Sequence, residues 1–180
     1  MEENGMLFGK EIYLRPMTEE DTDLIVLWRN REFVRRNFIY QKPFTREGHL
    51  KWIHTMVDTG KVVQFMICEK ASKRPVGSVY LRDIDREHRK AEYGVFIGEE
   101  DALGKGYGTE AAGLITAYGF ENLHLHKIML RVLAENARAR KSYEKAGFVQ
   151  EAYLKDEVFL QGAFQDVIYM AMINEKKNGE

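Results

Sequence analysis

A glycine-rich run ahead of a predicted helix constrains the fold of this chain more than any other feature. Residues 103–112 read L-G-K-G-Y-G-T-E-A-A, and the alternate glycines are Gly104, Gly106 and Gly108. Glycine permits backbone conformations that other residues avoid, and it leaves neighbouring N–H groups uncovered. At the N-terminus of a helix such groups favour a phosphate or pyrophosphate. The run therefore predicts a phosphate-binding turn that leads into a helix over residues 107–121.

The spacing of the glycines narrows the choice of ligand. A nucleotide-hydrolysing P-loop requires G-x-x-x-x-G-K-[ST], and the run does not contain it. The dinucleotide fingerprint G-x-G-x-x-G needs its third glycine one position later, and an acidic residue about 20 positions downstream. Residues 124–127, near that distance, read H-L-H-K. From spacing alone, a dinucleotide site and a helix start without a ligand both stay open.

The composition is that of an ordinary globular chain. Its 180 residues are 44% hydrophobic, which suits a single domain over 1–180 with a core of about 11–173 and short flexible ends. The net charge of −1, without long runs of one sign, gives no argument for a nucleic-acid or membrane partner. No signal peptide or apolar span is evident, which predicts a cytoplasmic protein. The 5 histidines form no H-E-x-x-H pattern, so no metal is expected.

Hydrophobic periodicity and the positions of glycine and proline predict a mixed α/β domain. Strands are expected at 12–15, 62–69, 76–83, 91–97, 128–133, 148–153 and 167–173, which makes a sheet of about seven strands. Helices are expected at 18–30, 31–38, 45–57, 107–121 and 137–146. A strand, helix, strand crossover surrounds the glycine turn, and the final two strands form a hairpin that turns at Gln161 and Gly162.

A second motif follows about 30 residues after the glycine turn. Residues 135–148 read E-N-A-R-A-R-K-S-Y-E-K-A-G-F, in which a strand ends near Asn136 and the next helix presents Tyr143. In this order and separation, the two motifs resemble the GNAT superfamily of N-acetyltransferases. The resemblance runs from Ile12 to about Ile173. The branch it resembles includes ribosomal-protein N-terminal, polyamine and nucleotide-amino-sugar acetyltransferases.

The resemblance implies a twisted mixed sheet with helices on both faces, and acetyl-CoA as the co-substrate without a metal. Backbone amides of residues 103–109 would hold the pyrophosphate, and the main chain of residues 95–97 would pair with the pantetheine arm like an added strand. The residues expected to contact the cofactor are Val95, Phe96, Ile97, Leu103, Gly104, Lys105, Gly106, Tyr107, Gly108, Thr109, Asn136, Tyr143 and Lys145. The family usually has Gln or Arg at Leu103 and often Ser at Ala139. Because the phosphate contacts are mainly from the backbone, the first change should cost little.

Acetyl transfer requires an amine that has lost a proton and a proton donor for the departing thiolate. By the resemblance, Tyr143 is the general acid; the alternative is a phenol that only packs on the pantetheine. Glu92 is the predicted base, because strand alternation places it on one face with Gly94 and Phe96. The missing side chain at Gly94 would leave room there for a substrate. The alternative is a solvated carboxylate, with water carrying the proton to bulk.

The charge of the segment expected to line the acceptor site indicates what kind of amine the protein binds. The segment W-R-N-R-E-F-V-R-R-N, residues 28–37, lies where the family admits its acceptor and is basic. Such a lining would repel a polycation such as spermidine and attract a phosphate-bearing amine. The segment also resembles acetyltransferases of nucleotide-linked amino sugars. The expected acceptor contacts are Trp28, Arg29, Arg31 and Arg35, and the alternative is a solvated basic helix face.

An anionic, nucleotide-linked amino sugar is therefore the predicted acceptor. The alternatives are the N-terminal amine of a ribosomal protein and a polyamine. A non-catalytic acyl-CoA sensor and a nicotinamide-dependent oxidoreductase are alternatives of other classes. The protein is expected to act as a monomer or homodimer.

Overall fold

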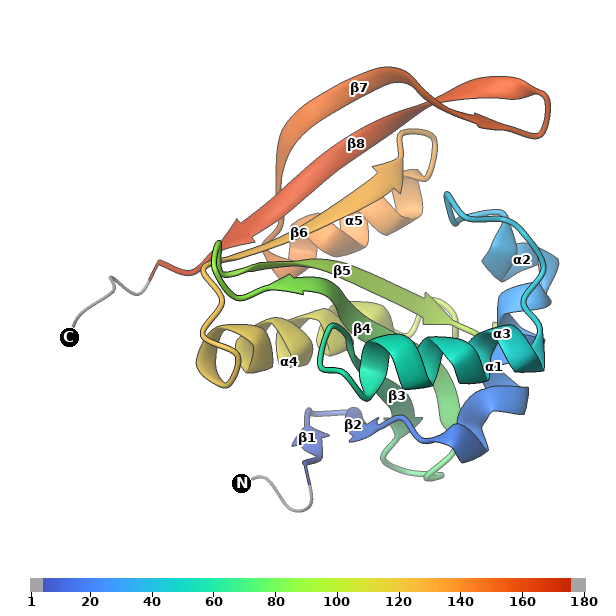
Figure 1. Cartoon of the computed structure of the whole chain (residues 1–180), viewed down its shortest axis with the longest axis vertical. Helices are drawn as coiled ribbons and strands as arrows, with labels where there is room; N and C mark the ends of the chain where they lie inside the picture. The colour runs from blue at the N-terminus through green and yellow to red at the C-terminus, as the bar shows by residue number, and fades with distance from the viewer. Residues whose placement is uncertain (1–4, 176–180) are drawn as a thin grey trace.

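A computed structural model describes residues 5–175, so the extreme ends predicted to be flexible lie outside the described part of the chain. Strands form one sheet in the order β1-β2-β3-β4-β5-β6-β8-β7 (Figure 1). The strands are β1 (Leu7–Phe8), β2 (Ile12–Pro16), β3 (Val63–Glu69), β4 (Pro75–Asp85), β5 (Lys90–Ile97), β6 (Lys127–Leu133), β7 (Val149–Leu160) and β8 (Ala163–Ile173). The helices are α1 (Thr22–Asn30), α2 (Glu32–Arg35), α3 (Arg46–Trp52), α4 (Tyr107–Glu121) and α5 (Ala137–Ala146), with short turns η1 (Glu19–Asp21), η2 (Ile53–Val57) and η3 (Glu100–Ala102).

The predicted mixed α/β sheet is confirmed, and its sheet has 8 strands because the short β1 joins the edge beside β2. The helix expected at 45–57 is two segments: Thr45 caps α3 through its side chain, and the chain then widens into a π-helical turn, η2. The basic helix expected at 31–38 is only the short α2, and a loop follows it to Thr45.

Helices cover both faces of the sheet, and the side chains of β3 point alternately into the cores on these two faces. Phe65 and Ile67 belong to the core beneath α4, which also contains Ile115. Met66 and Cys68 belong to the core on the opposite face, beneath α1. Successive side chains of a strand point to opposite faces, so a continuous apolar run on β3 serves two helical layers.

The sheet opens between β5 and β6, the one parallel pair among the described strands. These strands pair only from Lys90–Lys127 to Glu92–Met129 and then diverge. On its other side β5 stays paired with β4 as far as Ile97. The backbone of Val95, Phe96 and Ile97 is therefore free to hydrogen-bond on the side facing the opening.

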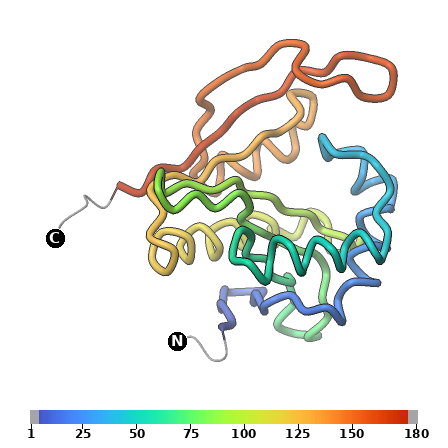
Figure 2. The backbone as a smooth tube through the Cα atoms, in the orientation of Figure 1, coloured from blue at the N-terminus to red at the C-terminus, as the bar shows by residue number. Residues whose placement is uncertain are grey.

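The β7–β8 hairpin extends beyond the body of the sheet and curves toward the loop after α2 (Figure 2). The turn is at Gln161 and Gly162, as predicted. The Gln161 side chain donates a hydrogen bond to the Gln41 amide oxygen at 3.1 Å. This contact joins two loops far apart in sequence on the same side of the molecule as the opening between β5 and β6.

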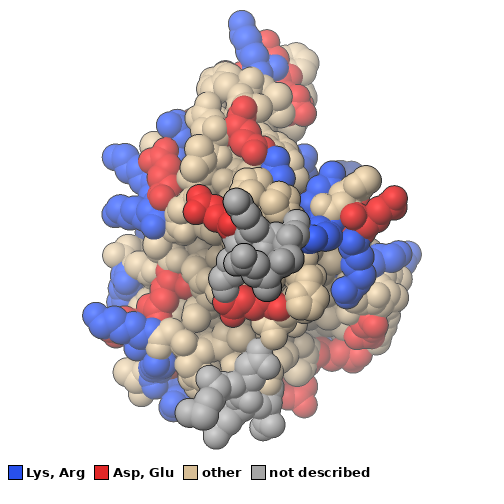
Figure 3. Space-filling model, turned by 90° about the vertical axis from the view of Figure 1, so that its left-hand side faces the viewer, with Lys and Arg blue, Asp and Glu red and all other residues tan. Residues whose placement is uncertain are grey.

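Charged side chains of both signs are interspersed on the face shown in Figure 3, in keeping with the net charge of −1. Across residues 5–175, the helices are too short or too polar to cross a bilayer.

Candidate active site

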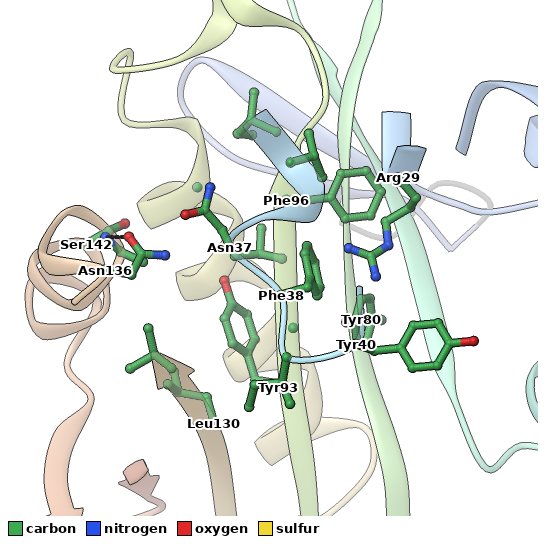
Figure 4. A pocket seen from close by; sticks show the side chains of 18 of the residues that line it. Arg29, Asn37, Phe38, Tyr40, Tyr80, Tyr93, Phe96, Leu130, Asn136 and Ser142 are labelled. Atoms are coloured by element: carbon green, nitrogen blue, oxygen red, sulfur yellow. Dashed lines mark hydrogen bonds between the residues drawn. The ribbon is translucent and has the colours of Figure 1, made fainter. Parts of the chain in front are cut away.

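A cleft of about 1280 Å³ occupies the opening between β5 and β6. The glycine turn and α5 line one part of it, and α1, α2 and the loop before α3 line the other. Figure 4 shows Asn136 and Ser142 on one side, Arg29, Phe38 and Tyr80 on the other, and Tyr93 between them. We refer to these as the α5 side and the α1 side of the cleft.

The glycine turn has the geometry of a phosphate cradle. Gly104 and Gly106 have φ values of 77° and 84°, a left-handed conformation that glycine adopts without strain. Gly106 is the N-cap of α4, so the N–H groups of the first turn have no partner within the helix. A Cβ placed on Gly104 or Gly106 would meet nothing within 4 Å. The space over this helix end is therefore open to a ligand.

Helix α5 forms over residues 137–146, as predicted, and Ser142 on this helix lies next to the end of the glycine turn. The Asn136 side chain caps the helix by accepting from the Ala139 N–H at 3.2 Å. This bond uses the amide oxygen and leaves the Asn136 NH₂ group for the cleft. The hydroxyls of Thr109 and Ser142 lie 2.8 Å apart and join α4 to α5.

Tyr143 lies on α5 at the wall of the cleft beside β5. Its ring packs edge-on against Tyr93, with centroids 5.8 Å apart, and against Phe148 at 6.2 Å. Burial raises the pKa of the Tyr143 phenol above its usual value of about 10. Tyr143 is therefore protonated at neutral pH, as a proton donor must be.

Glu92 is the one carboxylate among the described residues that line the cleft, and two arginines hold it. Its Oε1 accepts from Arg82 Nη2 at 2.8 Å and from Arg131 Nε at 3.1 Å. The Glu92 side chain is 12% exposed. The space expected for a substrate at Gly94 is instead filled by the Tyr80 ring, which lies 2.3 Å from where a Cβ would stand. Glu92 thus faces the cleft from within a cluster of charges.

Most of the predicted site residues line this cleft. They are Arg29, Glu92, Val95, Phe96, Ile97, Leu103, Gly104, Gly106, Tyr107, Gly108, Thr109, Asn136, Tyr143 and Lys145.

Four predicted site residues point elsewhere because other groups hold their side chains. Lys105 lies 3.5 Å from Glu69. Trp28 is fully buried against Gly98, and its indole donates to Glu99 at 2.7 Å. Arg31 pairs with Glu99 at 3.0 Å, and Arg35 pairs with Glu32 at 2.9 Å.

Sequence reasoning missed Tyr80, Arg82, Tyr93 and Arg131, all of which line the cleft. Arg82 could have been found from the β4–β5 pairing, because it lies directly opposite Glu92 in the register. Tyr93 and Arg131 carry no local motif. No group of His, Cys, Asp and Glu able to hold a metal is present within residues 5–175.

Comparison with known proteins agrees with the fold and the cleft. The family described as the Acetyltransferase (GNAT) domain matches residues 11–149. A spermidine N(1)-acetyltransferase of Vibrio cholerae is 30% identical over 168 residues, 93% of this chain and 96% of the relative. One of Escherichia coli is 34% identical over 172 residues, 92% of this chain and 87% of the relative.

The solved structures include a close match. The crystal structure of the Vibrio cholerae spermidine N-acetyltransferase in complex with CoA and spermine superposes with a TM-score of 0.86. The two sequences are 28% identical, and the superposition covers 93% of this chain and 98% of the Vibrio cholerae chain.

This chain belongs to the GNAT family of acetyltransferases. It is an acetyl-CoA-dependent N-acetyltransferase. Of the functions considered from the sequence, an acetyltransferase is therefore favoured over a non-catalytic acyl-CoA sensor and over a nicotinamide-dependent oxidoreductase. The cleft fits the co-substrate: it offers a left-handed glycine turn open to a pyrophosphate, a free β5 edge, and the lining cations Arg138, Lys141 and Lys145.

Proposed function

We propose that this enzyme acetylates a primary amine of a small molecule by direct attack, with both substrates bound together. The observation that carries this is the continuity of the cleft. The glycine turn, Tyr143, Glu92 and Arg29 all line one cavity, so an amine on the α1 side meets the thioester without a covalent enzyme intermediate.

For the donor, the amides of residues 103–109 would hold the pyrophosphate, and the free edge of Val95, Phe96 and Ile97 would pair with the pantetheine arm. The Asn136 NH₂ group and the Lys145 ammonium would contact the molecule from α5. In this arrangement, backbone amides would bind the phosphates, and side chains of α5 would supply the positive charge.

Tyr143 would donate a proton, or a hydrogen bond, to the thiolate as it departs. Its burial keeps it protonated, and its place on α5 next to β5 puts the phenol beside the path of the pantetheine. Tyr143 would therefore act on the leaving group and not on the amine.

Glu92 would orient the attacking amine and take its proton through a water molecule. Both oxygens already face guanidinium groups, at 2.8 Å from Arg82 and 3.4 Å from Arg131. A carboxylate has about four lone-pair positions. Room therefore remains for the amine or for a bridging water.

Two acceptor classes have support, and the comparisons favour the polyamine over the amino sugar predicted from residues 28–37. The relatives named above are spermidine acetyltransferases. The charge of the cleft favours an anionic amine, because Glu92 is paired with two arginines and Arg29 is an additional cation. A putative ribosomal N-acetyltransferase of Bacillus subtilis, 31% identical over 104 residues, supports a protein N-terminus more weakly.

Free-thiol release from acetyl-CoA tests the proposal across spermidine, glucosamine, a UDP-linked amino sugar and a peptide with a free N-terminus. Saturable release with a small amine, and acetylation of that amine seen by mass spectrometry, is expected. Release with the peptide alone would contradict the small-molecule acceptor. Accumulation of acetylated enzyme without amine would contradict direct attack.

A further inference from the structure

Three buried side-chain atoms within residues 5–175 have no hydrogen-bond partner, and all belong to residues that line the cleft. They are Arg29 Nη1, His49 Nε2 and Tyr93 OH. Nearly all buried polar groups of folded proteins are hydrogen-bonded, so an exception needs an explanation. Their location in one cleft places these unpaired groups where a ligand or an ordered water can complete them.

Arg29 is the most demanding of the three because it carries a charge. Arg29 is 6% exposed, its Nη1 has no hydrogen-bond partner, and it forms no ion pair with a carboxylate within residues 5–175. The guanidinium carbon lies 3.4 Å from the centroid of the Phe38 ring and 4.5 Å from that of Phe44. Burial lowers the pKa of Arg29 to about 10, so the group is still a cation at neutral pH.

Aromatic rings offset only part of the cost of burying such a charge. A cation over a ring gains on the order of 1–2 kcal/mol, whereas an unpaired buried charge costs several kcal/mol. Arg82 adds a second positive charge near Arg29 and lowers the pKa of Arg29 further. An anion is the group that would lower the energy of this part of the cleft most.

The position of Arg29 relates it to the acceptor and not to acetyl-CoA. Figure 4 shows the guanidinium on the α1 side, near Phe38 and Tyr80, across the cleft from Asn136 and Ser142. Tyr80 in turn covers Gly94, two residues from Glu92 along β5. An amine next to Glu92 can therefore carry its other substituents toward Arg29.

We propose that Arg29 forms a subsite for an anionic group of the acceptor, a carboxylate or a phosphate. The proposal rests on the proposed function and specifies its substrate class: a primary amine that bears a negative charge. It makes a polyamine a poor acceptor, because a second ammonium would face Arg29.

Matched pairs of amines test the subsite by steady-state kinetics. The phosphate arm compares glucosamine 6-phosphate with glucosamine, and the carboxylate arm compares 4-aminobutanoate with butylamine. In at least one arm, wild-type kcat/KM is expected to be at least tenfold higher for the anionic member. The arm with the larger ratio identifies the anion.

Arg29→Met is expected to bring that ratio to about one, because methionine fills the apolar cage without the charge. Arg46→Met is the matched control: Arg46 is exposed, pairs with Asp23 and lies outside the cleft, so the ratio should stay at the wild-type value. Arg29→Lys keeps the charge without the planar fork and should give an intermediate ratio. If Arg29→Met does not fold, Arg29→Lys decides, and an unchanged ratio overturns the proposal.

A wild-type ratio near one in both arms, or spermidine as the best acceptor, also overturns the subsite while leaving the acetyl transfer intact. If no amine is acetylated, the proposed function fails, and binding tests the subsite separately. Glucosamine 6-phosphate should then raise the melting temperature of the CoA-saturated protein, more than glucosamine does and not in Arg29→Met. No such difference would overturn it.

Discussion

At the scale of single residues, Tyr143 is the side chain whose removal should affect the chemical step most. Tyr143→Phe keeps the ring packing against Tyr93 and Phe148 but removes the proton donor. The kcat is expected to fall about 10²-fold, with the dissociation constant of acetyl-CoA nearly unchanged. Stopped-assay turnover and calorimetric titration measure the two quantities. Tyr153→Phe, on the exposed hairpin, is the control; an equal loss in both variants would contradict the assignment.

The raised pKa of Tyr143 also predicts how kcat depends on pH. A group whose pKa is raised keeps its proton to higher pH, so the donor form persists beyond the usual value of about 10. Wild-type kcat should therefore show no descending limb up to pH 10. A fall in kcat with an apparent pKa of 8 to 9, absent from Tyr143→Phe, would show that the phenol ionises earlier.

The role of Glu92 as a base can be tested by measuring how the effect of its substitution on kcat/KM changes with pH. Glu92→Gln should lower kcat/KM by about 10²-fold at pH 7, where the amine arrives protonated. Near pH 10 the free amine is abundant, so the defect should shrink to a few fold. A defect of constant size would mean that Glu92 acts only by pairing Arg82 and Arg131. Thermal unfolding at each pH checks that the variant stays folded, since removing one partner of a pair destabilises.

At the scale of elements, the glycine turn makes a prediction that depends on its backbone. Gly106 has a φ of 84°, where an L-residue costs about 1–2 kcal/mol, while a methyl group there would meet no protein atom. Gly106→Ala should therefore raise the dissociation constant of acetyl-CoA about tenfold as the turn relaxes and its N–H groups shift. Calorimetric titration measures the change.

The control for this variant lies in the same helix. Gly113 is exposed within α4 and has open space around it, so Gly113→Ala should stabilise the protein by about 0.5–1 kcal/mol and leave the affinity unchanged. Equal acetyl-CoA affinities for Gly106→Ala and the wild type would mean that the turn does not hold the pyrophosphate.

The elements also show which parts of the structure could be predicted from sequence. Helix α5 was predicted with its exact bounds, because Asn136 caps one end and Gly147, at a φ of 103°, ends the other. Both signals are local. Strand β1 has only two residues and forms because Leu7 and Phe8 pair with β2, which no periodicity reveals. The π-helical turn η2, in which Ile53 is buried, likewise has no local sequence signal that predicts it.

In the candidate site, too, the parts with a local sequence signal could be predicted and the parts formed by tertiary contacts could not. The glycine turn and the Tyr143 helix are continuous segments, so their spacing could be recognised. The cluster around Glu92 combines side chains of β4, β5 and β6, and Arg131 joins it across a parallel pair 39 residues away. Trp28 and Arg31 were predicted to contact the acceptor because the segment is basic, but Glu99, reached through tertiary contacts, holds both.

At the scale of the whole molecule, two hydrogen-bonded carboxylates, those of Asp21 and Glu99, predict how stability depends on pH at the acid end. Burial opposes ionisation of Asp21, but hydrogen bonds from Arg15 and Thr18 outweigh it and lower its pKa. A hydrogen bond from Trp28 lowers the pKa of Glu99. A carboxylate with a lowered pKa contributes stability above its unfolded value of about 4, and this is lost as the pH falls through its folded value.

The melting temperature should therefore fall steeply below about pH 4. A smaller decline should begin below about pH 6.5, the unfolded value of His49, because burial lowers the pKa of His49 in the folded protein. Asp21→Asn should melt at a lower temperature at pH 7 and lose less on acidification. Differential scanning calorimetry from pH 7 to 3 measures both curves. A wild-type melting temperature that is unchanged at pH 3 would contradict the contribution of these carboxylates.

The location of CoA in this molecule tests the account of the active site most directly. A crystal structure with bound CoA should show the pyrophosphate at the amides of residues 103–109 and the pantetheine paired with Val95 to Ile97. The sulfur should lie within hydrogen-bond distance of the Tyr143 hydroxyl. A pyrophosphate bound away from the glycine turn, or a sulfur beyond reach of Tyr143, would contradict the account.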